Sequence, residues 1–327
     1  MYEIRYYTKT RRNSVLRRRR RVKALFIILM FLPILPFLVY KLSSPTTESV
    51  AGIISPLAHD VIEKGFSIII PDVNSKALEE IVQSQLKEAK GTYAVYIKNL
   101  NTRERYYFNE QKKFDTASMY KLYVLATAFS QIQKGKFSES DVLNQDIAVL
   151  NEKFNIATES AELTEGRLTL PVRVAMERMI TISDNYSALL LSEKVRIANI
   201  NSFLKENSFS QTKMGGIDTN PVTSAYDTGL FFEKLYKGEL ANQIYTDRML
   251  SLLKNQKKNT KFSKYLPQDT VIAHKTGELG DISHDAGIVY TKKGDYIIVV
   301  LSQTASPLSA DEKIADISKA VYNYFIN

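Results

Sequence analysis

The chain has no cysteine and only three histidines among its 327 residues. The absence of cysteine excludes disulfides, thiolate nucleophiles and cysteine-ligated zinc, and it leaves the redox compartment open. The histidines, His59, His274 and His284, are too few and too scattered to predict a metal site, and a Ser-His-Asp triad would have to recruit one of them. We therefore expect no metal and no cofactor, and we interpret each histidine as a surface or structural residue.

An excess of charge is also missing from most of the chain. The formal net charge of +9 is carried by residues 1–23, which hold ten Lys or Arg and one Glu. Residues 24–327 hold 34 basic and 34 acidic residues. Because this main part is electroneutral, its bulk charge does not indicate a partner, and we expect no nucleic acid.

Residues 24–40, ALFIILMFLPILPFLVY, form a run of 17 uncharged residues. As a helix the run would span about 25 Å against a hydrocarbon core of about 30 Å, which suffices when flanking side chains snorkel. Five arginines at 17–21 precede it, and positive residues stay on the cytoplasmic side. The pattern predicts a single-pass signal anchor in the cell membrane, with everything after Lys41 extracytoplasmic.

Two alternatives compete with the anchor. A cleaved signal peptide would have a shorter apolar core, and SVA at 49–51 is its candidate cleavage site. An arginine run could instead bind nucleic acid, although a run followed at once by an apolar segment is typical of a topology determinant. We favour the anchor and divide the chain into a cytoplasmic tail (1–23), a transmembrane segment (24–40), an extracytoplasmic stalk (41–75) and a folded domain (76–327).

The folded domain is expected to combine strands from both of its ends with a helical middle. Apolar spacing predicts a helix from Lys76, and alternating runs predict hairpins at 92–109 and 286–303. An amphipathic helix closes the chain, and residues 116–260 have mainly helical patterns. The fold class is α/β (α+β): an antiparallel sheet built from both chain ends, flanked by helices, plus an inserted all-helical lobe, with a cleft between the lobes.

Ser-x-x-Lys occurs five times and alone carries little information. The pairs are Ser84/Lys87, Ser118/Lys121, Ser202/Lys205, Ser210/Lys213 and Ser251/Lys254. Ser118-x-x-Lys121 is followed in order by Ser183-Asp184-Asn185 and Lys275-Thr276-Gly277, and these two motifs each occur once. The ordered set of three is typical of penicillin-recognising acyl-serine enzymes.

The flanking text resembles the class A β-lactamase group of these enzymes. KFDTASMYKLYVLATAF is similar to the nucleophile helix of that family, LTLPVRVAMERMITISDNYSALLLSEKV to the segment around its second motif, and HKTGELGDISHDAGIVYTKKGDYIIVVLSQ to its third motif with the following strands. The resemblance extends from about Lys76 to the C-terminus. It implies the β-lactamase-like fold and an acyl-enzyme mechanism.

The resemblance implies catalytic roles for the first and second motifs. Ser118 would be the nucleophile, at a helix N-terminus whose dipole favours a developing oxyanion. Lys121, three residues on and on the same helix face, would take its proton if burial or a second cation, Lys275, lowers its pKa. Ser183 would relay a proton to the leaving nitrogen, and Asn185 would hold the amide of the substrate. Asp184 is expected to fix its own loop.

The third motif is implied to bind the carboxylate end of the substrate. Lys275 and Thr276 suit a carboxylate by charge and hydroxyl donation, and Gly277 permits close backbone approach. The backbone N–H groups of Ser118 and Glu278 would form the oxyanion hole, with no need for the Glu278 side chain. The expected ligand is a β-lactam or a peptidoglycan stem peptide.

The sequence departs from the family where the acyl-enzyme would be hydrolysed. Hydrolytic class A enzymes carry a Glu-x-x-Leu-Asn element whose glutamate activates water, and it is absent from this chain. The loop is expected to be shorter than the full loop of the family by about ten residues, which exceeds the usual boundary error of a few residues. Asp218 is the only carboxylate in its remnant, MGGIDTNP, and Glu206 is assigned to the preceding helix. Asp218 is a candidate substitute base, but turn chemistry explains it equally well.

Three functions remain open. The first is a membrane-anchored β-lactam hydrolase that forms a Ser118 acyl-enzyme and deacylates slowly. The second is a D-alanyl-D-alanine carboxypeptidase of the penicillin-binding type, acting on stem peptides. The third is a binding or sensing module for cell-wall peptide without turnover. The sequence does not predict an oligomeric state.

Overall fold

The computed structural model describes residues 72–216 and 219–327. The predicted cytoplasmic tail, the transmembrane segment and nearly all of the predicted stalk lie outside these residues, as do His59 and Asp218. Over the two described ranges, no helix has both the length and the apolar character that crossing a membrane requires.

A six-stranded sheet in the order β1-β3-β2-β10-β9-β8 forms the centre of the domain. Its strands are β1 (Val73–Asn74), β2 (Thr92–Asn99), β3 (Glu104–Phe108), β8 (Ile272–Leu279), β9 (Ile282–Val289) and β10 (Tyr296–Gln303). The sheet is mixed, because β1 runs parallel to β3 whereas all other neighbours are antiparallel. The expected purely antiparallel sheet is wrong at this edge, where a strand of two residues is too short to show an alternating pattern.

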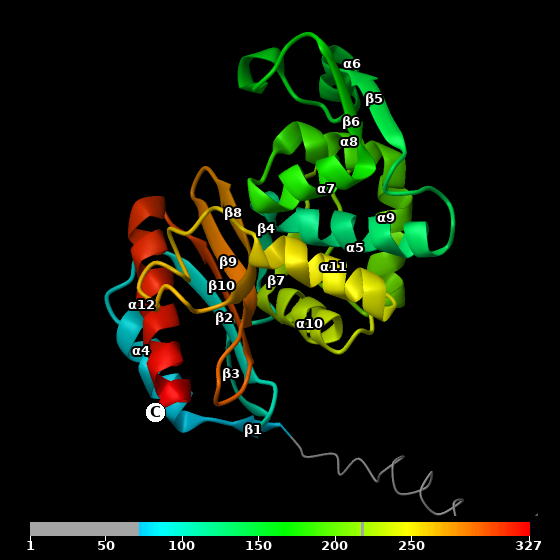
Figure 1. Cartoon of the computed structure of the whole chain (residues 1–327). Coiled ribbons are helices and arrows are strands. Elements are labelled where there is room, and N and C mark those ends of the chain that lie inside the picture. Colours follow the sequence, from blue (N-terminus) through cyan, green and yellow to red (C-terminus); the bar gives the residue numbers. More distant parts are fainter. Residues whose placement is uncertain (1–71, 217–218) are drawn as a thin grey trace, which may run out of the picture. The chain divides into compact units, whose positions relative to one another are not determined.

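The sheet joins the two ends of the domain, as predicted. β2 from the N-terminal part pairs with β10 from the C-terminal part over eight residues, from Thr92↔Gln303 to Asn99↔Tyr296. β2, β9 and β10 are buried along almost their whole length. Strands covered on both faces read as continuous apolar runs, and helices cover this sheet on both sides (Figure 1).

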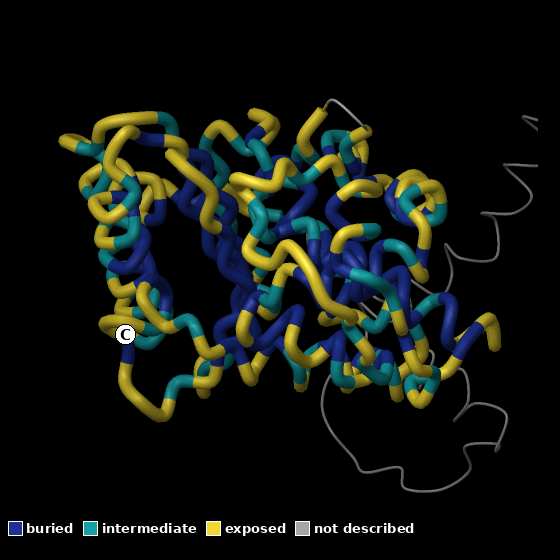
Figure 2. Tube along the Cα trace, turned by 90° about the horizontal axis from the view of Figure 1, so that it is seen from above, coloured by how far each residue is buried: buried dark blue, intermediate teal, exposed yellow. Residues whose placement is uncertain are grey.

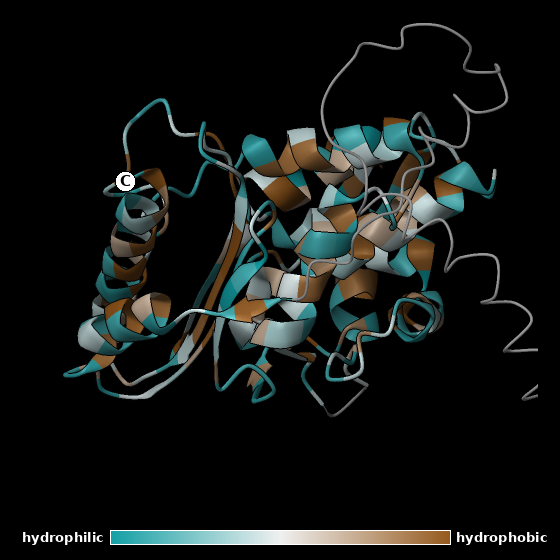
Figure 3. Ribbon diagram, turned by 90° about the horizontal axis from the view of Figure 1, so that it is seen from below, coloured by the Kyte–Doolittle hydropathy of each residue, from teal (hydrophilic) through white to brown (hydrophobic). Residues whose placement is uncertain are grey.

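One face of the sheet is covered by α4 (Lys76–Leu86) and α12 (Pro307–Ile326). These two helices share a hydrophobic cluster with the strands, to which Leu78, Val82, Ile314 and Ile317 contribute. α12, which ends at the marked C-terminus, carries hydrophobic and hydrophilic residues together (Figure 3), as expected of a helix with one face on a sheet and one on solvent.

The other face of the sheet is covered by the helical lobe. Its helices are α5 (Tyr120–Gln133), α6 (Ile147–Lys153), α7 (Val172–Thr181), α8 (Asn185–Val195), α9 (Ile197–Glu206), α10 (Ala225–Tyr236) and α11 (Gln243–Lys254), with 3₁₀ turns η1 (Ala117–Met119) and η2 (Thr158–Ser160). α5 is buried on nearly all sides and forms the axis of the lobe. The buried residues run through the centre of the molecule in Figure 2, and the exposed ones lie on the outside.

The lobe is not all-helical. Two short antiparallel pairs interrupt it: β4 (Lys113–Asp115) with β7 (Val222–Ser224), and β5 (Val142–Asp146) with β6 (Arg167–Pro171). These strands have three to five residues. Sequence periodicity needs longer windows to detect a strand, which explains why they were not predicted. The β4–β7 pair leads directly to the first motif.

Candidate active site

Ser118 lies in the 3₁₀ turn η1, just before the first residue of α5. The preceding residue, Ala117, has φ of +42°, a conformation that costs energy for any residue with a Cβ. Such strained residues are common at functional sites, where the surrounding contacts hold the backbone in place. Backbone hydrogen bonds hold the turn on both sides: Thr116 N donates to Pro221 O at 2.8 Å and Met119 N to Thr116 O at 2.8 Å. No hydrogen bond of the Ser118 hydroxyl is found within the described residues, so its oxygen is free for a ligand.

Lys121 points from the first turn of the buried helix α5 toward the second motif. Its side chain is fully buried, and Nζ donates to Ser183 O at 2.6 Å, Asn185 Oδ1 at 2.7 Å and Ser183 Oγ at 3.3 Å. Packing and these three hydrogen bonds fix the position of the amine. The structure thus brings the first and second motifs together through Lys121.

The Ser183 hydroxyl lies between two lysines. Its Oγ accepts from Lys275 Nζ at 2.9 Å and from Lys121 Nζ at 3.3 Å, and Lys275 also donates to Thr276 O at 2.8 Å. An oxygen that accepts from two lysine Nζ atoms keeps its own hydrogen for a third partner. Ser183 itself has φ of +62°, and Asp184 caps α8 by accepting from Ser187 N at 2.6 Å, in agreement with the loop-fixing interpretation of Asp184.

Burial lowers the pKa of Lys121 to about 7; the charge of Lys258 adds to this lowering, whereas Asp184 and Glu162 oppose it. Burial, followed by the charge of Lys121, lowers the pKa of Lys275 well below its ordinary value. Lys275 was the cation expected to lower the pKa of Lys121. Burial is the larger cause, and Lys258 is a contributor that the motifs did not reveal.

The third motif lies on the edge strand β8, against the turn that carries Ser118. A Cβ added to Gly277 would lie 3.1 Å from Met119 Cγ and 3.2 Å from Thr116 O, so glycine lets the two backbones approach. This places the segments of Ser118 and Glu278 side by side, as an oxyanion hole made of their N–H groups requires. Thr276 is buried, and no hydrogen bond of its hydroxyl is found in the part of the chain that the structure describes.

His284 connects the sheet to the segment that precedes Ser118. It is fully buried on β9, and its Nε2 donates to Asp115 O at 2.9 Å while Ser302 N donates to Nδ1 at 3.1 Å. Burial lowers the pKa of His284 to about 4, so the ring is neutral at ordinary pH. His274 is also buried, with Nδ1 2.9 Å from Asp285 Oδ1. Both histidines are structural, as the sequence suggested.

Glu278 has a side-chain role that the sequence analysis did not assign. Its Oε1 accepts from Lys261 Nζ at 2.5 Å and its Oε2 from Lys258 Nζ at 2.9 Å. Burial alone would raise the pKa of Glu278, but hydrogen bonds from Lys261 and Lys258 outweigh it and lower the pKa to about 2.

Glu162 is a second site residue that the sequence analysis missed. Asn185 Nδ2 donates to Glu162 Oε1 at 2.5 Å, and the charge of Glu162 acts on Lys121. The residue lies in an irregular loop between η2 and β6, anchored by Leu163 N and O on the Tyr186 hydroxyl at 3.0 and 2.6 Å. A lone glutamate in a polar loop has no pattern that predicts such a position.

Backbone pairing brings together the two ends of the segment between α9 and α10. Lys213 and Val222 exchange backbone hydrogen bonds at 2.9 and 3.0 Å. Next to this pair, the fully buried Asp227 of α10 accepts at Oδ2 from Gln211 N, Thr212 N and Thr212 Oγ1 at 2.7 to 2.8 Å. Glu206 ends α9, as predicted. Asp218 is outside the described residues, so its assignment as a candidate base stays a prediction.

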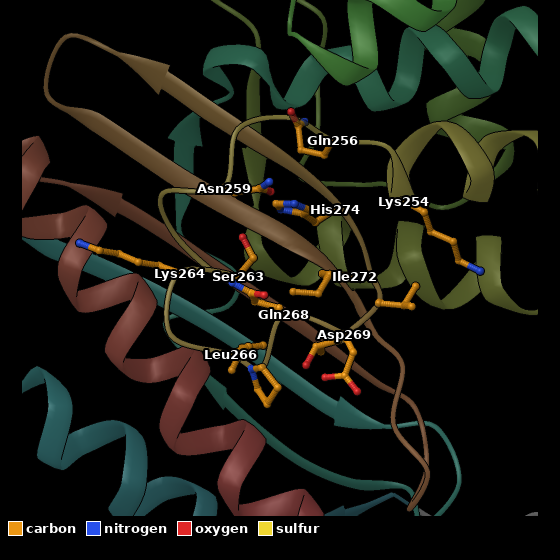
Figure 4. Close-up of a pocket in the computed structure, with 13 residues that line it drawn as sticks. Lys254, Gln256, Asn259, Ser263, Lys264, Leu266, Gln268, Asp269, Ile272 and His274 are labelled. Atoms are coloured by element: carbon orange, nitrogen blue, oxygen red, sulfur yellow. The ribbon is translucent and has the colours of Figure 1, made fainter.

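A separate hollow of about 650 Å³ lies behind β8 (Figure 4). Lys254, Gln256, Ser263, Asp269, Thr270 and His274 are among its lining residues. Neighbouring residues of a strand point to opposite faces, so His274 turns into this hollow while Lys275 turns toward Ser183. None of the three motifs lines it.

A serine hydroxyl without a partner among the described residues, three positions before a buried lysine of lowered pKa, and a second serine bridged between two lysines are typical of a serine hydrolase of the acyl-enzyme class. The chain matches the model of the β-lactamase enzyme family over residues 75–325 and belongs to this family. The class predicted from the three motifs is thereby confirmed.

Individual relatives are distant but cover nearly the whole domain. The chain is 22% identical to β-lactamase VEB-1 from Pseudomonas aeruginosa over 293 residues, 80% of this chain and 95% of the relative. It is 23% identical to the extended-spectrum β-lactamase PER-1 from the same organism, over 82% of this chain and 93% of the relative. The solved structure of PBP-A superposes with a TM-score of 0.70 at 24% identity, covering 79% of this chain and 98% of PBP-A. That superposition confirms the β-lactamase-like fold.

Proposed function

We propose that this chain is a membrane-anchored, extracytoplasmic serine hydrolase that attacks β-lactam amides and releases the acyl group slowly. The observation that carries the proposal is the buried amine of Lys121, which has a pKa of about 7 and contacts Ser183 and Asn185. An amine of this pKa is partly neutral near pH 7 and serves as a base. The membrane anchor rests on the apolar run 24–40 and the arginines before it.

The chemistry proceeds in two stages. Ser118 Oγ attacks the lactam carbonyl carbon while its proton passes to Lys121 Nζ, and the N–H groups of Ser118 and Glu278 receive the oxyanion. The C–N bond then breaks, and the ring nitrogen takes a proton from the Ser183 hydroxyl, which is replenished from Lys121 or Lys275. The product is an ester on Ser118. Water must cleave that ester to regenerate the serine.

The proposal of slow release of the acyl group is based on the α9–α10 segment. Lys213 pairs with Val222 across it, and the Glu-x-x-Leu-Asn element is absent from the sequence. In the described part of the chain, no carboxylate is hydrogen-bonded to Ser118 or to Lys121. Asp218, the candidate base, lies outside the described residues, and we expect the adduct to persist.

A second candidate is a carboxypeptidase of the penicillin-binding type that acts on peptidoglycan stem peptides. An enzyme that transfers or hydrolyses peptide acyl groups forms the same Ser118 ester. The absence of the Glu-x-x-Leu-Asn element, which serves β-lactam hydrolysis, also favours this candidate. PBP-A offers a parallel: the structure of one of its single-residue mutants is an acyl-enzyme complex with penicillin G, with a TM-score of 0.70 to this chain.

Time-resolved mass spectrometry of the purified domain with benzylpenicillin tests both candidates. We expect a covalent adduct on Ser118 that decays over minutes or longer, and none in Ser118→Ala. Rapid loss of the adduct would contradict slow release. A permanent adduct together with release of D-alanine from a stem-peptide mimic would favour the carboxypeptidase. Absence of any adduct in the unmodified protein would refute both.

A further inference from the structure

Glu278 holds two lysines at the end of the third motif. Lys261 is completely buried and lies between Glu278 Oε1 at 2.5 Å and Asp311 Oδ1 at 3.6 Å. Lys258 is more open: its side chain and that of Glu278 are each 41% exposed, with 2.9 Å between Nζ and Oε2. The carboxylate thus bridges one buried and one half-exposed cation at the cleft edge of β8.

Lys258 belongs electrically to the reaction centre. After burial, its charge is among the causes that lower the pKa of both Lys121 and Lys275. Lys258 and Lys261 therefore form a cationic region beside Lys121 and Lys275, and Glu278 neutralises it at the exposed edge. Such a region attracts a ligand carboxylate, which binds best where charged donors converge.

We propose that Glu278 is a built-in substitute for a ligand carboxylate and thereby a specificity-determining residue. It occupies Lys258 and Lys261, so a ligand that carries a carboxylate near β8 has to displace it, whereas a ligand without that charge does not. The inference rests on the proposed function only in taking a β-lactam as the ligand. Glu278 would disfavour ligands with a free carboxylate, and it would do so at the third motif, where the resemblance implies that the carboxylate binds.

Two observations support competition at this position. The pKa of Glu278, about 2 through its two lysines, keeps the carboxylate charged at every pH of an ordinary assay. The neighbouring Leu279 is 53% exposed, and Gly280, with φ of +54°, has no atom within 4 Å of an added Cβ. The end of β8 is therefore open, and the Glu278 side chain has room to leave the lysines.

The test measures binding without catalysis. In a Ser118→Ala background, the dissociation constants of benzylpenicillin and of its methyl ester are measured by calorimetry, and their ratio gives the preference for the free carboxylate. We expect Glu278→Gln, which keeps the size of the side chain and removes its charge, to increase this preference at least about fivefold, the scale of one recovered charge-assisted contact at a half-exposed site. Glu278→Asp, which cannot reach both lysines, is expected to give a smaller increase.

Glu312→Gln is the matched control, because Glu312 also contacts a lysine, Lys264, and a tyrosine, but on the outer helix α12. It should leave the preference as it is. An unchanged or reduced preference in both Glu278 variants would overturn the proposal and make the residue a structural tether, and so would failure of every variant to bind benzylpenicillin. Since no step of this experiment needs acylation, the adduct test on Ser118 decides the proposed function separately.

Discussion

The two sides of Ser118 are built in different ways. On one side, buried groups from α5, the start of α8 and β8 meet: Lys121, Ser183 and Lys275 hold one another at 2.9 to 3.3 Å. On the other side, Asp227 anchors the start of the α9–α10 segment from within the core. Under the proposed function, the groups that form the ester are fixed by packing, whereas release depends on the length of a surface segment. The length of that segment can then vary while the fold and the ester-forming groups stay the same.

Removing the base should have the largest effect. We expect Lys121→Met to slow acylation by at least about 10³-fold, since general-base catalysis contributes about 10²–10⁴ and the Ser183 contacts are lost as well. Stopped-flow acylation by a chromogenic β-lactam measures the rate. The control is Lys87→Ala at the end of α4, whose Ser84-x-x-Lys87 pair has the same spacing on an exposed surface. Equal losses in both variants would contradict the assignment.

Removing the carboxylate of Asp227, which anchors the α9–α10 side, should lower the free energy of unfolding. Asp227→Ala leaves the buried N–H groups of Gln211 and Thr212 without their acceptor, and we expect a loss of about 2–4 kcal/mol in the free energy of unfolding. Urea denaturation measures it, with the exposed Asp247→Ala as control. Acylation by the folded fraction should stay within about threefold, because Asp227 contacts none of the motif residues. A collapse of acylation in folded protein would mean that the two sides are coupled.

Widening the contact between the third motif and the Ser118 turn should slow acylation about tenfold. In Gly277→Ala the new Cβ lies 3.1 Å from Met119 Cγ, and the shift needed costs about 1–3 kcal/mol. Gly216→Ala is the control, with its nearest atom at 3.6 Å. Rate constants for ester formation and thermal unfolding of both variants separate a displaced oxyanion hole from general destabilisation. No change in rate would show that the turn adapts freely.

The smallest expected effects are shifts in pH dependence. The acylation rate should rise with pH below about 7 and level off above it, because the lowered pKa of Lys121 leaves the amine protonated only below that pH. Lys258→Gln removes a charge that lowers this pKa and should move the midpoint to higher pH. Glu162→Gln removes a charge that raises it and should move the midpoint to lower pH. Shifts in the same direction in both variants would refute the electrostatic account.

Long periodic segments made most of the fold predictable. The helix at Lys76–Leu86, both hairpins and the closing helix are present. Within the mainly helical middle, α10 begins at Ala225, because Thr223 pairs in β7 with Phe114. The short strands and the parallel β1 were missed, since pairing across the chain decides them and not local periodicity.

The site was predictable only where several motifs had to agree. The ordered set predicted Ser118, Lys121, Ser183, Asn185, Lys275 and Thr276 as site residues, and the structure brings their segments together. The positions of Glu162 and Lys258 depend on how irregular loops fold back to the cleft. The side-chain contacts of Glu278 depend on two lysines about 20 residues earlier in the chain. No spacing rule connects such residues.

The hydroxyl of Ser183 gives the site a direction before any ligand arrives. Both of its acceptor positions are taken by lysine Nζ atoms that the core holds in place, so its hydrogen is left for a third partner. Under the proposed function that partner is the leaving nitrogen, and the donor is in position before the ligand arrives. The proposed proton path from lysine to serine to leaving nitrogen then needs no rearrangement of these side chains.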